Sequence, residues 1–250
     1  PLLKSQKQAQ SLTVCCPKSL VRLFTRIPGV DSIVDTDSPL PDYELHCSFM
    51  DLPALFGTRL ENIPAAIPYL TPEPSDINKW QTRLGSEPRP KVGIVWAGGK
   101  KTMADAVRSL TLTHFLPLAK VSDVCFVSLQ KGEGPSASLA TEGELPMLDW
   151  TSELGDFADT AALIETLDLV ISVDTSVAHL AGALGKPVWL LNRFGSEWRW
   201  LLDRRDSPWY PSVTIYRQQD RDEWSVLLQE IAQDLRLWVD KHASGVPLPV

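Results

Sequence analysis

The residues best placed to do chemistry lie at Asp174, Thr175 and Ser176, where an apolar run ends and a run of small residues begins. The preceding run, 169–173, has the unbroken apolar character of a parallel strand covered on both faces. The following residues, Val177–Leu184, predict a helix that ends at a left-handed Gly185. A helix that starts at the carboxyl end of such a strand directs backbone N–H groups at anions, diphosphates above all. Taken alone, the pattern fits equally well an ordinary helix capped by Ser176.

The surrounding sequence predicts the sheet that would position this turn. Apolar runs at 92–96, 124–129, 188–191 and 213–216 predict further strands, with a short one near 145–148. Amphipathic segments at 112–119, 157–167 and 222–240 predict helices between and after them. Repeated strand–helix–strand units imply a doubly wound parallel sheet, whose ligands bind at the carboxyl ends of the strands.

The first seventy residues predict a second, smaller α/β unit. Strands are expected at 12–16, 32–35 and 43–49, with helices at 17–27 and 50–56. Prolines then flank a short polar helix with Ser75 as its expected N-cap. We therefore expect an N-terminal domain over 1–74, a hinge over 75–90 and a C-terminal domain over 91–250.

The string from Val170 to Val188 resembles the signature of bacterial heptosyltransferase-like glycosyltransferases, which are similar to glycosyltransferase family 9. It is most similar to the glycosyltransferase portion of bacterial tetratricopeptide-repeat proteins. Residues 92–98, 108–110, 126–132, 156–161 and 198–211 also match. The resemblance implies a GT-B-like α/β fold of two Rossmann-like domains with parallel sheets, of which the N-terminal, acceptor-side domain is incomplete here.

The resemblance also implies a metal-independent hexosyl or heptosyl transfer from a nucleotide-diphosphate sugar, with no cofactor. It assigns the donor phosphates to Gly98, Arg108, Asp174, Thr175, Ser176 and Val177, and it turns Gln130 and Lys131 toward the nucleotide. The nucleotide base, the sugar and the acceptor, whether glycan, lipid or protein, stay open.

A catalytic base is harder to find. In the family that base lies on a loop before the helix end that Pro1-Leu-Leu-Lys4 resembles, so we expect it outside this chain and the chain to be part of a longer protein. His46 and His179 are candidates, although a lone histidine one turn into a helix is more often a packing residue. Asp35, Asp37 and Asp42 qualify by residue type only.

Three other functions fit parts of the pattern. A non-catalytic module that binds nucleotide sugars would keep the turn at Asp174 and lack the base. A sugar-nucleotide epimerase would need more titratable groups. A dinucleotide-dependent dehydrogenase would need a GxGxxG turn after a strand, which the sequence lacks.

The composition of the chain excludes some classes of binding partner. The net charge of −7 over 250 residues argues against nucleic acid and anionic membranes. Neither a signal peptide nor an apolar run of spanning length is present, since Ala161–Val173 is interrupted by acidic residues. The cysteines Cys15, Cys16, Cys47 and Cys125 fit neither a metal motif nor a disulfide framework, which indicates free thiols and a cytoplasmic location.

Overall fold

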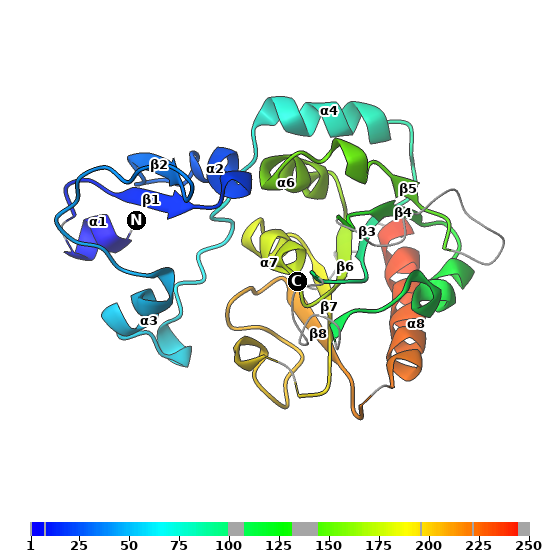
Figure 1. Ribbon diagram of the computed structural model, residues 1–250. Helices are drawn as coiled ribbons and strands as arrows, with labels where there is room; N and C mark the ends of the chain where they lie inside the picture. Colours follow the sequence, from blue (N-terminus) through cyan, green and yellow to red (C-terminus); the bar gives the residue numbers. More distant parts are fainter. Residues whose placement is uncertain are drawn as a thin grey trace.

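A six-stranded parallel sheet forms the larger part of the protein. The structure is a computed structural model that describes residues 2–7, 9–99, 108–131, 145–195, 197–221 and 223–244. The strands are β3 (Lys91–Val95), β4 (Cys125–Ser128), β5 (Leu148–Asp149), β6 (Leu169–Val173), β7 (Val188–Asn192) and β8 (Val213–Arg217). Their order is β5-β4-β3-β6-β7-β8, and every neighbouring pair is parallel (Figure 1). The strand order therefore reverses between β3 and β6, which is where such sheets bind ligands.

Both faces of this sheet are covered, which explains why its strands are apolar throughout. In β6, Leu169, Ile171 and Val173 pack with η3 (Leu112–Lys120) and α8 (Trp224–Ala243) on one face. Val170 packs on the other face with α6 (Phe157–Glu165), α7 (Ser176–Ala183) and α4 (Pro74–Leu84). The predicted doubly wound α/β arrangement is confirmed. No helix of the described residues combines the length and the apolar character that a membrane span needs.

The predicted helix bounds need small corrections. The last helix runs from Trp224 to Ala243, and its predicted start at Asp222 lies outside the described residues. The helix at 112–119 is a 3-10 helix, Leu112–Lys120, and it contains Pro117, a residue that disfavours the interior of an α-helix. Gly185 follows α7 at φ +77°, as expected for the residue after a helix end.

The N-terminal part holds a separate, two-stranded sheet, at the left of Figure 1. Strand β1 (Thr13–Cys16) pairs in parallel with β2 (Ser32–Asp35), and α2 (Lys18–Phe24) joins them. The remaining elements are α1 (Leu2–Lys7), η1 (Phe49–Asp51), α3 (Leu52–Leu55), η2 (Leu60–Asn62).

The strand predicted over 43–49 is wrong. Tyr43 is 59% exposed and Leu45 is 89% exposed. A strand needs both a neighbouring edge and a surface on which to bury alternate side chains. Residues 43–47 have neither here, so alternation of apolar and polar residues did not produce a strand.

Helix α4 occupies the segment that was predicted as a hinge. It starts at Pro74, with Glu73 as N-cap, so the prediction that Ser75 caps it is wrong. Proline fits the first turn, where its missing N–H would be unpaired in any case. Trp80 of α4 is 1% exposed and packs in the same core as α6, so this helix is attached to the six-stranded half.

Candidate functional site

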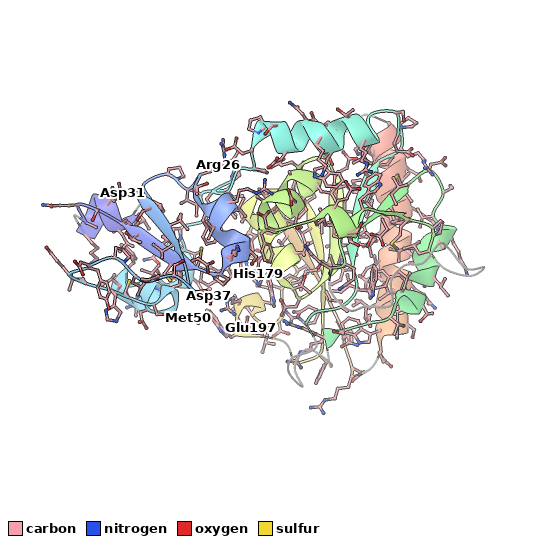
Figure 2. All side chains as sticks on the ribbon, turned by 45° about the horizontal axis from the view of Figure 1, so that its top comes forward. Arg26, Asp31, Asp37, Met50, His179 and Glu197 are labelled. Carbon is pink, nitrogen blue, oxygen red and sulfur yellow. The ribbon has the colours of Figure 1, made fainter. Side chains whose placement is uncertain are left out.

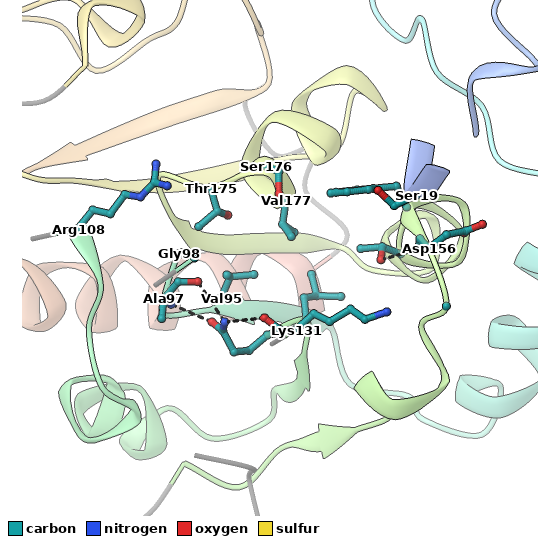
Figure 3. A pocket seen from close by; sticks show the side chains of 16 residues that line it. Ser19, Val95, Ala97, Gly98, Arg108, Lys131, Asp156, Thr175, Ser176 and Val177 are labelled. Atoms are coloured by element: carbon teal, nitrogen blue, oxygen red, sulfur yellow. Dashed lines mark hydrogen bonds between the residues drawn. The ribbon is translucent and has the colours of Figure 1, made fainter. Parts of the chain in front are cut away.

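A cavity of about 480 Å³ lies at the carboxyl ends of β3, β4 and β6. It is therefore at the point where the strand order reverses. The structure brings most of the predicted site residues to its wall, and Figure 3 shows them. These are Gly98, Arg108, Gln130, Lys131, Thr175, Ser176 and Val177.

The N-terminus of α7 forms one wall of the cavity. Thr175 is its N-cap, in an extended conformation and with no side-chain capping hydrogen bond, so the alternative of an ordinary helix capped by Ser176 is wrong. The buried hydroxyl of Thr175 lies 3.1 Å from the Ser172 hydroxyl instead. Ser176 and Val177, the first two helical residues, line the cavity. The positive end of the helix dipole is thus directed at the cavity, as an anionic ligand requires.

Arg108 supplies a cation on the neighbouring wall. Its guanidinium lies so close to Gly98 that a Cβ at that position would come within 2.8 Å of Arg108 Nε. The Gly98 N–H donates to the Ser109 hydroxyl at 3.1 Å, which ties the loop after β3 to the residue beside Arg108. A side chain at position 98 would therefore require the Arg108 side chain to shift.

Gln130 lines the cavity, but its amide is engaged with the backbone. Its Oε1 accepts from the N–H groups of Trp96 at 3.1 Å and Ala97 at 2.8 Å. Its Nε2 donates to the carbonyls of Ala97 at 3.1 Å and Lys131 at 3.3 Å. These contacts use all the hydrogen-bonding capacity of the amide. The geometry therefore favours Gln130 as the group that joins the loops after β3 and β4, and leaves the exposed Lys131 to meet a ligand.

The opposite wall comes from residues that sequence reasoning missed as site residues. Ser19 of α2 lines the cavity, together with Asp156 and Phe157 at the start of α6. Asp156 is the N-cap of α6, and its Oδ1 accepts from the N–H groups of Ala158 at 2.8 Å and Asp159 at 3.1 Å. A capping pattern at 156–159 was the available signal for Asp156. The sequence around Ser19 has no pattern that would identify it as a site residue.

Asp174 and His179 lie outside the set of residues that line the cavity. His179 Nε2 is 3.8 Å from Asp174 Oδ1, and His179 Nδ1 is 3.2 Å from the Tyr210 hydroxyl. The imidazole stacks on Trp200 with ring centroids 5.1 Å apart. Burial lowers the pKa of His179, against the opposing effect of Asp174, so the ring is neutral near pH 7. These contacts describe a packed, hydrogen-bonded histidine.

The other candidates for a base do not line the cavity. His46 is exposed and packs edge-on against Tyr43. Asp35, Asp37 and Asp42 do not line the cavity either. The carboxylate that does, Asp156, is paired with Arg22, which lowers its pKa below the ordinary value of 3.8 and makes it a weak base.

Comparisons with known proteins give a similar family and a similar fold. Residues 154–223, which include α6, β6 and α7, match the family model of glycosyltransferase family 9 (heptosyltransferase). Protein FlbA of Caulobacter vibrioides is 32% identical over 191 residues, which is 74% of this chain. The chain spans only 31% of the length of FlbA.

Two solved structures share the fold. The ADP-heptose LPS heptosyltransferase II of E. coli superposes with a TM-score of 0.58 at 14% identity, over 95% of this chain and 92% of that one. A family 9 glycosyltransferase of Veillonella parvula superposes with a TM-score of 0.50 at 13% identity, over 94% and 68%. Residues 154–223 are therefore similar to glycosyltransferase family 9, the heptosyltransferase family, and the chain as a whole shares the fold of the two solved structures.

Proposed function

We propose that this chain is the donor-binding portion of a metal-independent glycosyltransferase, and that the cavity at the carboxyl ends of β3 and β6 holds a nucleotide-diphosphate sugar. The observation that carries the proposal is the convergence of Arg108 and the N-terminus of α7 on one cavity. Together they offer a fixed cation and a set of oriented N–H groups, which is the chemistry that a diphosphate needs.

The same groups would assist the reaction. When the bond from the sugar to the diphosphate breaks, negative charge grows on the departing phosphate oxygens. Donors that already point at this charge stabilise the transition state without reorganising. Arg108 and the α7 N–H groups would therefore do the work that a metal ion does in other transferases.

Two substitutions test the two parts of the site separately. Arg108→Gln removes the cation. Ser176→Pro removes one N–H at the first position of α7, where proline is well tolerated in helices, and the extended Thr175 before it suits a following proline. Ser176→Ala is the control for the hydroxyl, because it keeps the N–H. Arg89→Gln is the control for charge, because Arg89 pairs with Glu87 just before β3, at the amino end of that strand and opposite the cavity.

Calorimetry against ADP, UDP, GDP and their sugar conjugates is the measurement, and ADP-heptose is included because it is the donor named for the E. coli structure. We expect one nucleotide to bind. Arg108→Gln should weaken it about tenfold or more, since hydrogen bonds to charged groups contribute roughly 1.5–3 kcal/mol. Ser176→Pro should weaken it severalfold, while Ser176→Ala and Arg89→Gln should change little. Binding that is unaffected by both site variants would refute the assignment.

One observation favours a second function, a non-catalytic module that binds nucleotide sugars. Among the described residues that line the cavity, the carboxylate is Asp156, which is tied to Arg22 and is a weak base. A longer protein that carries this chain and a base, as the resemblance implies, would transfer sugar, and tetratricopeptide repeats in it would make a protein the first acceptor to test. Radiolabelled donor that is bound but never turned over by that longer protein would favour the module.

A further inference from the structure

A single arginine of the N-terminal part connects three helices beside the cavity. Arg22 of α2 makes a two-pronged contact with Asp156, through Nε to Oδ2 at 2.9 Å and Nη2 to Oδ1 at 2.8 Å. The same guanidinium donates to Asp159 of α6 and to Asp76 of α4. The pKa of Arg22 is raised, chiefly by its hydrogen bond to Asp156 and further by Asp159. Helix α2 is thus fixed to both neighbouring helices through one side chain.

Apolar packing supports the same attachment. Leu23, the next residue of α2, is 1% exposed and belongs to the core of the six-stranded half. Phe24 and Ile27 pack on that core from the same segment. The β1–α2–β2 unit is therefore held to the larger sheet through α2, and Arg22 fixes the polar edge of that contact.

This attachment reaches the cavity at two points. Ser19 precedes Arg22 by one helical turn and lines the cavity, and Asp156 lines it from α6. Figure 3 shows Ser19 and Asp156 on the side of the cavity away from Arg108. An ionised carboxylate on the wall of a site for an anion costs affinity unless a cation neutralises it. The charge-assisted, two-pronged contact of Arg22 offsets part of this negative charge, since the same guanidinium also pairs with Asp76 and Asp159.

We propose that Arg22 is a positioning residue of the donor site: it holds α2 against the start of α6, which fixes Ser19 in the cavity wall, and it offsets the negative charge that Asp156 presents to a diphosphate. The inference rests on the proposed function, because it takes the ligand to be a nucleotide diphosphate. Arg22 acts through Asp156 and Ser19 and does not itself line the cavity.

The chain offers a matched control just after the end of α2. Arg26 lies four residues after Arg22, donates to Glu73 and to the carbonyl of Thr71, and does not line the cavity. Its side chain is 34% exposed, against 40% for Arg22. In Figure 2, Arg26 lies apart from His179. Arg26→Gln therefore removes the same charge from the same region without touching the cavity wall.

The first test compares Arg22→Gln, Arg26→Gln and Asp156→Asn for affinity toward the nucleoside diphosphate that binds the wild type best. We expect Arg22→Gln to bind roughly fivefold to tenfold more weakly, at the low end of couplings between sites because the pair is half exposed. Arg26→Gln should stay within about twofold. Asparagine caps a helix as well as aspartate does, so Asp156→Asn keeps α6 intact and removes the wall charge. The double variant Arg22→Gln/Asp156→Asn should therefore recover affinity relative to Arg22→Gln.

Backbone hydrogen exchange supplies a second readout that does not depend on the ligand. Exchange of the 18–24 amides should accelerate in Arg22→Gln and not in Arg26→Gln. A lower melting temperature for Arg22→Gln with unchanged affinity, or no recovery in the double variant, would overturn the positioning role. Wild-type protein that binds no nucleotide would instead overturn the proposed function, and the exchange data would still decide whether Arg22 holds α2.

Discussion

The two halves of the chain follow the same strand–helix–strand pattern, but their strands are buried to very different extents. Every residue of β6 is buried, whereas β2 has none that is fully buried. The six-stranded sheet has helices on both faces. The two-stranded sheet of the N-terminal part is followed by a segment with exposed apolar side chains, which include Leu40, Tyr43, Leu45, Phe49 and Met50. The pattern of a βα unit therefore predicts its elements, while the number of neighbouring strands decides how much core they share.

The largest expected difference between the halves is the cost of a cavity in a central strand. Ile171→Ala in β6 and Ile33→Ala in β2 remove the same atoms from parallel strands. Ile171 is fully buried, so its loss should cost about 2–5 kcal/mol of unfolding free energy. Ile33 is only half-buried, so its loss should cost about 1 kcal/mol or less.

Urea unfolding can measure both variants. All nine tryptophans lie at position 80 or later, so their fluorescence reports on the six-stranded half, and circular dichroism reports on the whole chain. An Ile33→Ala cost equal to that of Ile171→Ala would show that the N-terminal sheet is as tightly packed as the larger one.

Loss of a side-chain hydrogen bond should also cost more unfolding free energy in the six-stranded half than in the N-terminal part, by a smaller margin. Gln130→Met keeps the length of the side chain but deprives the N–H groups of Trp96 and Ala97 of their acceptor. Trp96 is buried, so we expect a loss of about 1–3 kcal/mol. Asn62→Leu removes an exposed amide that accepts from Arg59 in the N-terminal part, where water replaces the lost bond. Its cost should be about 0.5 kcal/mol or less.

Thermal unfolding of these two variants measures the difference. A small cost for Gln130→Met would mean that water or a rearranged loop satisfies the freed N–H groups. The amide would then be available to a nucleotide, as the resemblance implied for this residue.

The sequence predicted most accurately those elements whose burial leaves a local pattern of apolar residues. The apolar runs that became β3, β6, β7 and β8 could be recognised because a strand covered on both faces has little room for polar residues. The carboxyl end of β6 led to Thr175 and Ser176, and the family resemblance led to Arg108; all three line one cavity. The segment 43–49 misled because alternation alone cannot show whether a partner strand exists. Ser19 and the Arg22–Asp156 pair could not be foreseen, since they arise where α2 and α6 pack across 134 positions of sequence.

The smallest expected effect concerns the place where the two halves meet, around His179. Its ring bonds to Tyr210, which is in turn hydrogen-bonded to Tyr69 of the segment that joins the halves. The backbone N–H of Tyr69 also donates to the carbonyl of Ala183 in α7, at 3.1 Å. Burial holds the pKa of His179 below the ordinary 6.5 of an unfolded chain.

The sign of the resulting pH dependence follows from proton uptake. As pH falls through 6.5, the unfolded chain binds a proton at this position before the folded one does, so stability falls until pH reaches the lower, folded pKa. Above pH 6.5 both states are neutral and the full stability is present. His179→Asn keeps a hydrogen-bonding group near Tyr210 and removes the titration. Its melting temperature should therefore change less than that of the wild type between about pH 5 and 7. An identical slope in the variant would mean that the titration of His179 does not contribute to the pH dependence of stability in this range.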